Sequence, residues 1–331
     1  MNSSPLISII VPVFNAGQTL HTALESILQQ EYTCLEIIMI DDCSLDNSID
    51  VMQHYIPLLQ RAGMKTRLIK HERNQGVAAA RNTGLEQASG EYIYHVDADD
   101  WLEPHALAVL LKKAKATAAD IVGCNWYLTF SENERMMKQP PFATAAQALE
   151  AMMNGTMRWN LWLFLVRRAL YQQHNIRFIP GMDMGEDMSV MLQLFLNATR
   201  VSFVEMSLYH YGQLNVQSLT KTYSDVHITQ VTANMRVLEQ RIAESAFAAV
   251  LSDKVDFLKL NIKLPLLVSD QEQQHQRWRP WFSEANGRVM ENKALPYRTR
   301  LLQWLAMKEQ FWAVRLYYRL VIKFIYGIVY K

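Results

Sequence analysis

The sequence predicts an α/β protein with a mixed, mostly parallel sheet that is flanked by helices and followed by a helical C-terminal extension. Three observations support this fold class. Short β-branched runs alternate with segments of helical periodicity over about the first 120 residues, a pattern typical of parallel sheets. Polar side chains come directly after three of these runs, as expected where parallel strands end at a binding crevice. From about residue 225 the pattern is helical, so we expect one domain over 1–222 and a helical region over 223–331.

The expected strands are short and apolar. The first covers 7–11 and should stop at Pro12, because proline cannot donate a hydrogen bond to a strand ladder. The second covers 36–40 and is followed by Asp41 and Asp42. The remaining strands are expected at 67–70, 92–96 and 121–123.

The helices between these strands follow from the spacing of apolar residues. Such residues recur at helical intervals over 20–28 and predict one buried face. Ser44 and Asp46 can cap the next helix, which should run to about Gln60. The remaining helices are expected at 76–88 and 104–116.

Three carboxylates stand within four residues after the fourth strand, at Asp97, Asp99 and Asp100. Such a cluster is costly unless a cation neutralises it. Because the chain turns at a strand end, Asp97 and Asp99 can converge on one divalent ion, and oxygen ligands favour Mg²⁺ or Mn²⁺ bound together with substrate phosphates. The alternative is an acidic helix N-terminus, with Asp100 as the cap of the helix near Pro104.

The composition indicates a protein of a reducing compartment. Cys34, Cys43 and Cys124 form no Cys-x-x-Cys pair and the first residues carry no secretion signal, so we expect a cytoplasmic location. The formal net charge of +1 hides an asymmetry. From Arg277 to Lys331 there are eleven Lys or Arg and three Glu, whereas the rest of the chain holds 22 basic and 29 acidic residues.

This basic tail is also rich in aromatic residues. Arg315, Arg319 and Lys323 would form one stripe on a helix, and their charges argue against a membrane-spanning segment. We expect the tail to lie on the inner face of the cytoplasmic membrane, and packing on the protein itself is an equal alternative. Since the basic residues are confined to the tail, no nucleic-acid partner is expected. The apolar residues of this stretch are Phe311, Trp312, Leu316, Leu320, Ile322, Phe324 and Ile325.

Six short motifs occur in order along residues 5 to 220. They are Val11-Pro12-Val13-Phe14-Asn15, Ile40-Asp41-Asp42-Cys43-Ser44, Arg73-Asn74-Gln75-Gly76, Ala80-Arg81-Asn82-Thr83-Gly84, Asp97-Ala98-Asp99-Asp100 and Gly185-Glu186-Asp187. Together they resemble the family-two glycosyltransferases of GT-A fold, a Rossmann-like fold. The resemblance implies inverting transfer of a sugar from a UDP-sugar donor to a hydroxyl of a glycan acceptor, with Mn²⁺ or Mg²⁺ held at the Asp-x-Asp element.

The resemblance also implies roles for the motif residues. Pro12 and Phe14 should line the base pocket, and Asp42 should accept a hydrogen bond from the base. Asn74 and Arg81 should shape the pocket near the ribose and diphosphate. The metal ligands implied are Asp99 and Asp97, with His210 as a further candidate for the metal or diphosphate. The alternative for His210, favoured for a lone histidine between two tyrosines, is a packed strand residue. The donor-binding residues implied are Pro12, Phe14, Asn15, Asp41, Asp42, Asn74, Arg81, Asp97 and Ala98.

The catalytic pair implied by the resemblance is Asp187 as general base and Glu186 as the residue that positions the base or the acceptor. Without the other motifs, both acids would be read as the first turn of a helix. Further along, Gln274, Arg277 and Trp278 match the Gln-x-x-Arg-Trp pattern of processive synthases. No channel helices accompany this match, so we expect it to be fortuitous and the enzyme to add one sugar or few.

The sequence therefore predicts an enzyme that extends a lipid-linked glycan for a cell-surface polysaccharide. The alternative is a non-catalytic module that binds nucleotide sugars without turnover. A dinucleotide-dependent oxidoreductase is disfavoured because the turn after the first strand lacks the Gly-x-Gly-x-x-Gly pattern.

Overall fold

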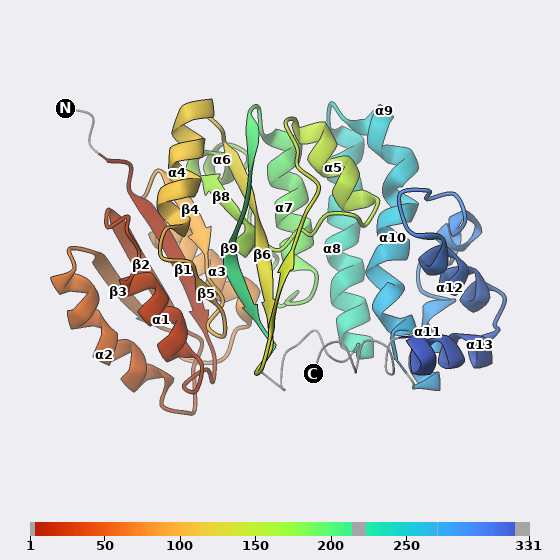
Figure 1. Ribbon diagram of the computed structural model, residues 1–331, viewed down its shortest axis with the longest axis horizontal. Coiled ribbons are helices and arrows are strands. Elements are labelled where there is room, and N and C mark those ends of the chain that lie inside the picture. Colours follow the sequence, from red (N-terminus) through yellow and green to blue (C-terminus); the bar gives the residue numbers. More distant parts are fainter. Residues whose placement is uncertain (1–3, 214–222, 270, 322–331) are drawn as a thin grey trace.

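The computed structural model describes residues 4–213, 223–269 and 271–321, and within these ranges it contains one nine-stranded sheet covered by helices (Figure 1). The strands are β1 (Ile7–Val13), β2 (Leu35–Asp41), β3 (Lys65–Lys70), β4 (Tyr92–His95), β5 (Trp101–Leu102), β6 (Ile121–Thr129), β7 (Glu134–Met137), β8 (Phe164–Arg167) and β9 (Val201–Gly212). Their order is β3-β2-β1-β4-β8-β6-β9-β5, with β7 paired to β6. Strands β1 to β4 pair in parallel with one another, β8 is antiparallel to β4 and β6, and β9 is parallel to β6. The predicted α/β fold is confirmed.

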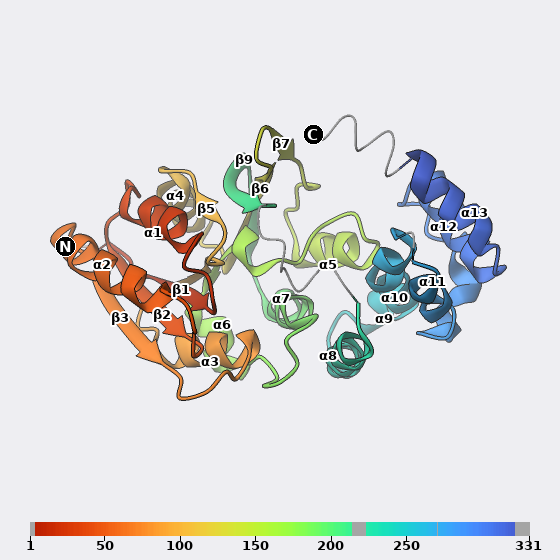
Figure 2. The same cartoon turned by 90° about the horizontal axis from the view of Figure 1, so that it is seen from below.

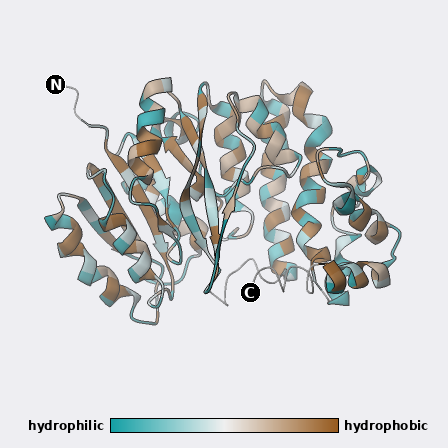
Figure 3. Cartoon of the chain, in the orientation of Figure 1, coloured by the Kyte–Doolittle hydropathy of each residue, from teal (hydrophilic) through white to brown (hydrophobic). Residues whose placement is uncertain are grey.

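Helices cover both faces of this sheet (Figure 2). Helices α1, α2 and α4 lie on one face of the sheet, where α4 packs against β6 and β9, and α3 lies on the other face against β1 and β2. All seven residues of β2 are buried, as expected for a parallel strand packed on both faces, and Figure 3 shows the apolar colouring of these strands. The helices of this part are α1 (Leu20–Leu28), α2 (Ser48–Arg61), α3 (Val77–Gln87), α4 (Ala106–Thr117), α5 (Ala145–Met153), α6 (Arg168–Gln173) and α7 (Glu186–Asn197).

The helical C-terminal region lies beyond α5 and α7, on the side away from β3 (Figure 1). Among the described residues, no helix is both long enough and apolar enough to cross a bilayer. The division of the chain at residue 222 stays a prediction. The helices of this region are α8 (Asp225–Glu244), α9 (Ala248–Leu251), α10 (Val255–Lys263), α11 (Glu272–Trp278), α12 (Tyr297–Met307) and α13 (Phe311–Tyr317).

The expectation that Pro12 ends the first strand was wrong, because β1 continues to Val13 with Pro12 opposite Ile40 of β2. On the other side of β1, the partner strand β4 ends at His95, which lies opposite Ile10. Val96 N–H donates to the carbonyl of Ile10, so this edge of β1 faces β4. Pro12 faces the same edge two residues later, past the end of β4, and therefore removes no ladder hydrogen bond.

The expectation that Asp100 caps a helix was also wrong. Trp101 and Leu102 form the short strand β5, and α4 begins only at Ala106. Asp100 is fully buried and accepts hydrogen bonds from the Gly212 N–H (2.8 Å) and the Tyr209 hydroxyl (2.8 Å). Burial and the neighbouring carboxylates raise its pKa well above the usual range. Asp100 thus fixes the end of β9 to the turn after β4.

Candidate active site

A cleft of about 990 Å³ opens at the carboxyl ends of the parallel strands. One wall is formed by the ends of β1, β2 and β4 with α3, and the other by the segment 155–160, the start of α7, and the helices α8 and α10. The structure brings most of the predicted site residues to this cleft. Those that line it are Pro12, Phe14, Asn15, Asp42, Asn74, Arg81, Asp97, Ala98, Asp99, Glu186 and Asp187.

Arg81 is the centre of the site. It lies on α3, is only 3% exposed, and its Nη1 donates to Glu186 Oε1 (2.7 Å) and Asp187 Oδ1 (2.6 Å). Its Nη2 donates to Asp97 Oδ1 at 3.0 Å. One guanidinium therefore joins the end of β4 to the start of α7, two segments that lie far apart in the sequence. The predicted contact of Arg81 with the donor is not tested by these bonds.

The two acids of α7 are presented by the local backbone. Gly185 precedes the helix in a left-handed conformation (φ +80°), which glycine adopts at little cost. Glu186 and Asp187 then occupy the first turn, where the helix dipole favours negative charge. The Leu161 N–H lies 3.4 Å from Asp187 Oδ2 and adds a further donor to this carboxylate.

Burial raises the pKa of both acids of this pair. It raises the pKa of Glu186 to about 8, assisted by the charge of Asp187. Burial also raises the pKa of Asp187, but Arg81 and a hydrogen bond with Glu186 lower it. At neutral pH we therefore take Glu186 as the protonated member of the pair and Asp187 as the ionised one, the state that a general base requires.

Asp42 holds the loop between β3 and α3. Its carboxylate accepts hydrogen bonds from the Gln75 N–H (2.9 Å) and the Gly76 N–H (2.7 Å), and His71 Nδ1 lies 2.7 Å from its Oδ1. Asn74 lies on this loop and lines the cleft. Asp42 is only 4% exposed, so its first role in the structure is to shape the wall on which Asn74 stands. The predicted hydrogen bond from a base to Asp42 stays a prediction.

The family of the chain follows from comparison with known proteins. The family model described as "Glycosyl transferase family 2" matches residues 8–191, which include every motif residue of the cleft described above. The chain belongs to glycosyl transferase family 2. Its similarity to this family thus extends from β1 into α7.

Three relatives of this family 2 chain illustrate the similarity. The "Uncharacterized glycosyltransferase YibD" of Escherichia coli (strain K12) is 33% identical over 222 residues, which are 64% of this chain and 62% of YibD. The match therefore spans less than two thirds of that relative. The crystal structure of S. aureus TarS in complex with UDP-GlcNAc has a TM-score of 0.69 at 19% identity, covering 95% of this chain and 91% of that chain. The mannosyltransferase PcManGT from Pyrobaculum calidifontis, in complex with GDP-Man and Mn²⁺, has a TM-score of 0.55 at 17% identity. The match covers 96% of this chain and 88% of that chain. At these identities the two structures support the GT-A fold alone.

The residues of this family 2 chain fit a divalent cation. Asp97 and Asp99 both line the cleft and are partly buried. Among the described residues, no group of three or more His, Cys, Asp or Glu could hold a metal ion by itself. Two carboxylates suit Mg²⁺ or Mn²⁺ nevertheless, since these ions usually take their other ligands from substrate phosphates and water. The fit is therefore to a cation shared between protein and donor.

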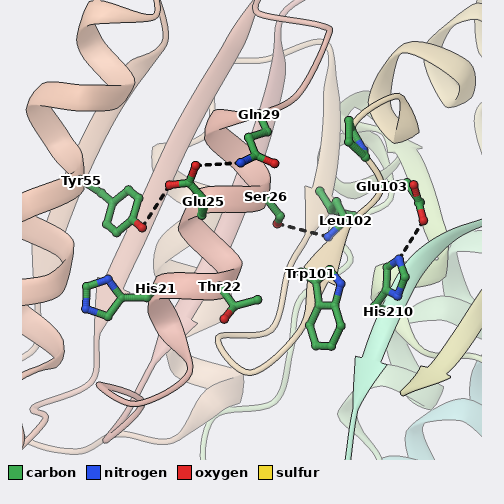
Figure 4. A pocket seen from close by; sticks show the side chains of 11 residues that line it. His21, Thr22, Glu25, Ser26, Gln29, Tyr55, Trp101, Leu102, Glu103 and His210 are labelled. Atoms are coloured by element: carbon green, nitrogen blue, oxygen red, sulfur yellow. Dashed lines mark hydrogen bonds and ion pairs between the residues drawn. The ribbon is translucent and has the colours of Figure 1, made fainter. Parts of the chain in front are cut away.

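Two predicted residues do not line the cleft. Asp41 is fully buried at the end of β2, where its Oδ1 accepts from the Ser44 N–H at 3.1 Å. His210 lies in a second pocket of about 510 Å³ beside α1, shown in Figure 4. It is 2.9 Å from Glu103 Oε1 and 2.8 Å from Glu134 Oε2, and it stacks on Trp101. The structure therefore does not bring His210 to Asp97 and Asp99.

Several residues of the cleft were not predicted. Asp183 lines it and accepts from the Ala78 N–H at 2.9 Å, and its position in a glycine-flanked segment was the one available signal. Trp162 also lines the cleft and stacks on Tyr209, with ring centroids 4.4 Å apart. The wall formed by α8 and α10 had no sequence signal, because it depends on how the C-terminal helices fold back.

Proposed function

We propose that this protein is a metal-dependent, inverting glycosyltransferase that moves a sugar from a UDP-sugar to a hydroxyl of a glycan in cell-surface polysaccharide synthesis. The observation that carries the proposal is that Asp97, Asp99 and Asp187 line one cleft, in which Arg81 binds both Asp97 and Asp187. Two separate sets of acids are what this reaction needs, one for the diphosphate side and one for the acceptor side.

The donor side of the cleft is supported by its chemistry. Pro12, Phe14 and Asn15 line the cleft at the end of β1, and the Phe14 ring is 47% exposed. An exposed aromatic ring in a cleft offers a stacking surface for a base. When bound between Asp97, Asp99 and the donor, Mn²⁺ or Mg²⁺ supplies Lewis-acid stabilisation for the departing diphosphate.

The acceptor side is served by Asp187. In the proposed reaction the ionised carboxylate takes the proton of the acceptor hydroxyl, the acceptor oxygen bonds to the anomeric carbon, and the bond from that carbon to UDP breaks. Attack from the face opposite the diphosphate inverts the anomeric configuration. Arg81 and the Leu161 N–H hold the carboxylate in place, and the proton on Glu186 limits the negative charge beside it.

The test compares Asp187→Asn with Glu186→Gln, using a panel of UDP-sugars with Mn²⁺. Thermal shift measures donor binding, because a ligand of the folded state raises apparent stability, and release of UDP measures turnover. We expect Asp187→Asn to bind donor while losing turnover by at least about a hundredfold, in the range of general-base catalysis. Glu186→Gln should lose less, because glutamine mimics the protonated acid. Donor binding without turnover in the wild-type protein would instead support the non-catalytic module.

The C-terminal helix supports a membrane location as part of this proposal. Phe311 and Val314 of α13 face the protein, where Phe311 stacks on His275 and Val314 is fully buried. Trp312, Leu316 and Leu320 recur every four residues and are 64%, 49% and 56% exposed. Arg319 is exposed beside them. An exposed apolar stripe with a basic neighbour suits the headgroup level of an anionic membrane, where a lipid-linked acceptor would be found. The predicted Ile322, Lys323, Phe324 and Ile325 lie outside the described residues.

Point variants test this location better than truncation, because α12 and α13 carry buried residues. Replacing Trp312, Leu316 and Leu320 by serine should release the protein from vesicles of anionic lipid in a sedimentation assay. The matched control replaces Leu45, Val226 and Val250, which are also exposed but lie elsewhere. Equal vesicle binding by both triple variants would refute the membrane location without touching the catalytic proposal.

A further inference from the structure

Arg158 is a cation that has no anionic partner among the described residues, in a cleft rich in acids. It lines the cleft, and among the described residues its guanidinium forms no ion pair or hydrogen bond, whereas its backbone N–H donates to Gln139 Oε1 at 2.6 Å. The side chain is exposed to the cleft yet surrounded by enough protein that desolvation lowers its pKa. Arg81, by contrast, forms ion pairs with three carboxylates.

The position of Arg158 is on the acceptor side. The segment 155–160 that carries it ends next to Leu161, whose N–H points at Asp187 Oδ2. Its anchor Gln139 is in turn bonded to Asn125 of β6, far from the ends of β1 and β2 that face the donor. Because the base must lie beside the acceptor hydroxyl, residues on this segment border the acceptor.

The surroundings of Arg158 suit a carbohydrate. Trp159, Tyr223 and Asn261 also line the cleft and offer aromatic faces and an amide. Two side chains of α11 fix the backbone of Tyr223 by hydrogen bonds. Gln274 Nε2 and Arg277 Nη1 both donate to the Tyr223 carbonyl, at 3.1 and 2.8 Å. The Gln-x-x-Arg-Trp match, expected to be fortuitous, therefore has a structural role here.

We propose that Arg158 selects an acceptor glycan that carries an anionic group, a carboxylate or a phosphate, near the hydroxyl that is glycosylated. This inference rests on the proposed function and adds the class of acceptor to it. An anionic acceptor would be repelled by the carboxylates of the cleft unless a cation received it, and Arg158 is the cation in position to do so. A planar guanidinium pairs with either a carboxylate or a phosphate through two parallel hydrogen bonds.

The experiment titrates acceptor analogues into the protein in the presence of UDP and Mn²⁺. Two matched pairs separate the two anions: 4-nitrophenyl glucoside with 4-nitrophenyl glucuronide, and mannose with mannose 6-phosphate. We expect the anionic member of at least one pair to bind about ten- to hundredfold more tightly, the range for a charged hydrogen bond. Arg158→Gln should remove this preference, and Arg158→Lys should keep part of it. Lys112→Gln, which removes one exposed charge from α4 outside the cleft, is the matched control.

Three results would overturn the inference. The wild-type protein could bind both members of each pair equally, the preference could survive Arg158→Gln, or Arg158→Gln could weaken UDP binding itself, which would place the residue at the diphosphate. UDP affinity is measured on the same samples. If the protein binds UDP but shows no preference for anionic acceptors, this inference alone is refuted. If it binds no UDP, the proposed function is refuted as well.

Discussion

Replacing Arg81 with methionine tests the charge balance of the site. The guanidinium is 3% exposed and lies within 3.0 Å of the carboxylates of Asp97, Glu186 and Asp187. Removing one partner of a buried ion pair costs about 3–5 kcal/mol, because the remaining charge is left buried and unpaired. We expect a loss of this size in the free energy of unfolding at pH 8, measured by urea denaturation.

The loss should depend on pH with a defined sign. The folded-state pKa of Glu186, about 8, lies above its ordinary value of 4.5, so the stability that this group contributes is full below about pH 4.5 and is lost as the pH rises through 8. Arg81 lowers the pKa of both Glu186 and Asp187, so without it both acids stay protonated to higher pH. The variant should therefore approach wild-type stability at pH 5 and diverge from it at pH 8.

The control for this experiment is Arg67→Met. Arg67 also faces a buried carboxylate, Glu36, at 3.5 Å, but its side chain is 50% exposed. Exposed pairs contribute about 0–1 kcal/mol, so this variant should lose little at any pH. If Arg81→Met lost less than about 1 kcal/mol at pH 8, or lost the same amount at pH 5 and pH 8, the electrostatic account of the site would be refuted.

Three further predictions concern the same site. Gly76→Ala should lower the free energy of urea unfolding by about 1–3 kcal/mol and weaken donor binding, because a Cβ there would lie 2.1 Å from Asp183 Oδ2 at a backbone φ of +90°. Gly63→Ala, with φ +85° and no atom within 4 Å of the added Cβ, measures the backbone strain alone, so equal losses in the two variants would contradict the steric argument. Asp100→Ala should cost about 2–4 kcal/mol, since it leaves two buried donors without their acceptor, and an unchanged urea midpoint would contradict this. Turnover at saturating donor should fall as the pH drops below neutral and Asp187, whose pKa is raised by burial, takes up a proton; a flat acid limb of the pH profile would argue against Asp187 as the base.

Much of the fold and of the cleft could be predicted from local patterns. Strand and helix positions follow from apolar periodicity. Parallel strands run in the same direction, so their carboxyl ends lie at the same edge of the sheet. This is why Phe14, Asn74 and Asp187, which are far apart in the sequence, were predicted together and were found lining one cleft.

The failures came from contacts that local patterns do not contain. Asp100 has the sequence context of a helix cap, but β9 pairs with Trp101 and Leu102 and supplies the two donors that Asp100 accepts. His210 stands between two tyrosines of a predicted strand, and the alternation of side chains along β9 places it beside Trp101 instead of at the Asp-x-Asp element. Both outcomes depend on the pairing of β5 with β9, for which the sequence holds no short-range signal.

The charges of the cleft link donor binding to the binding of a metal ion. The described residues that line it include six carboxyl groups and two guanidinium groups, so a diphosphate alone would meet a surface of its own sign. Arg81 already pairs with three of these acids, and Arg158 lies on the segment before Leu161, whose N–H contacts Asp187. We expect a divalent cation between Asp97 and Asp99 to offset this repulsion when an anionic donor binds. On this argument donor affinity itself, and not turnover alone, depends on the metal.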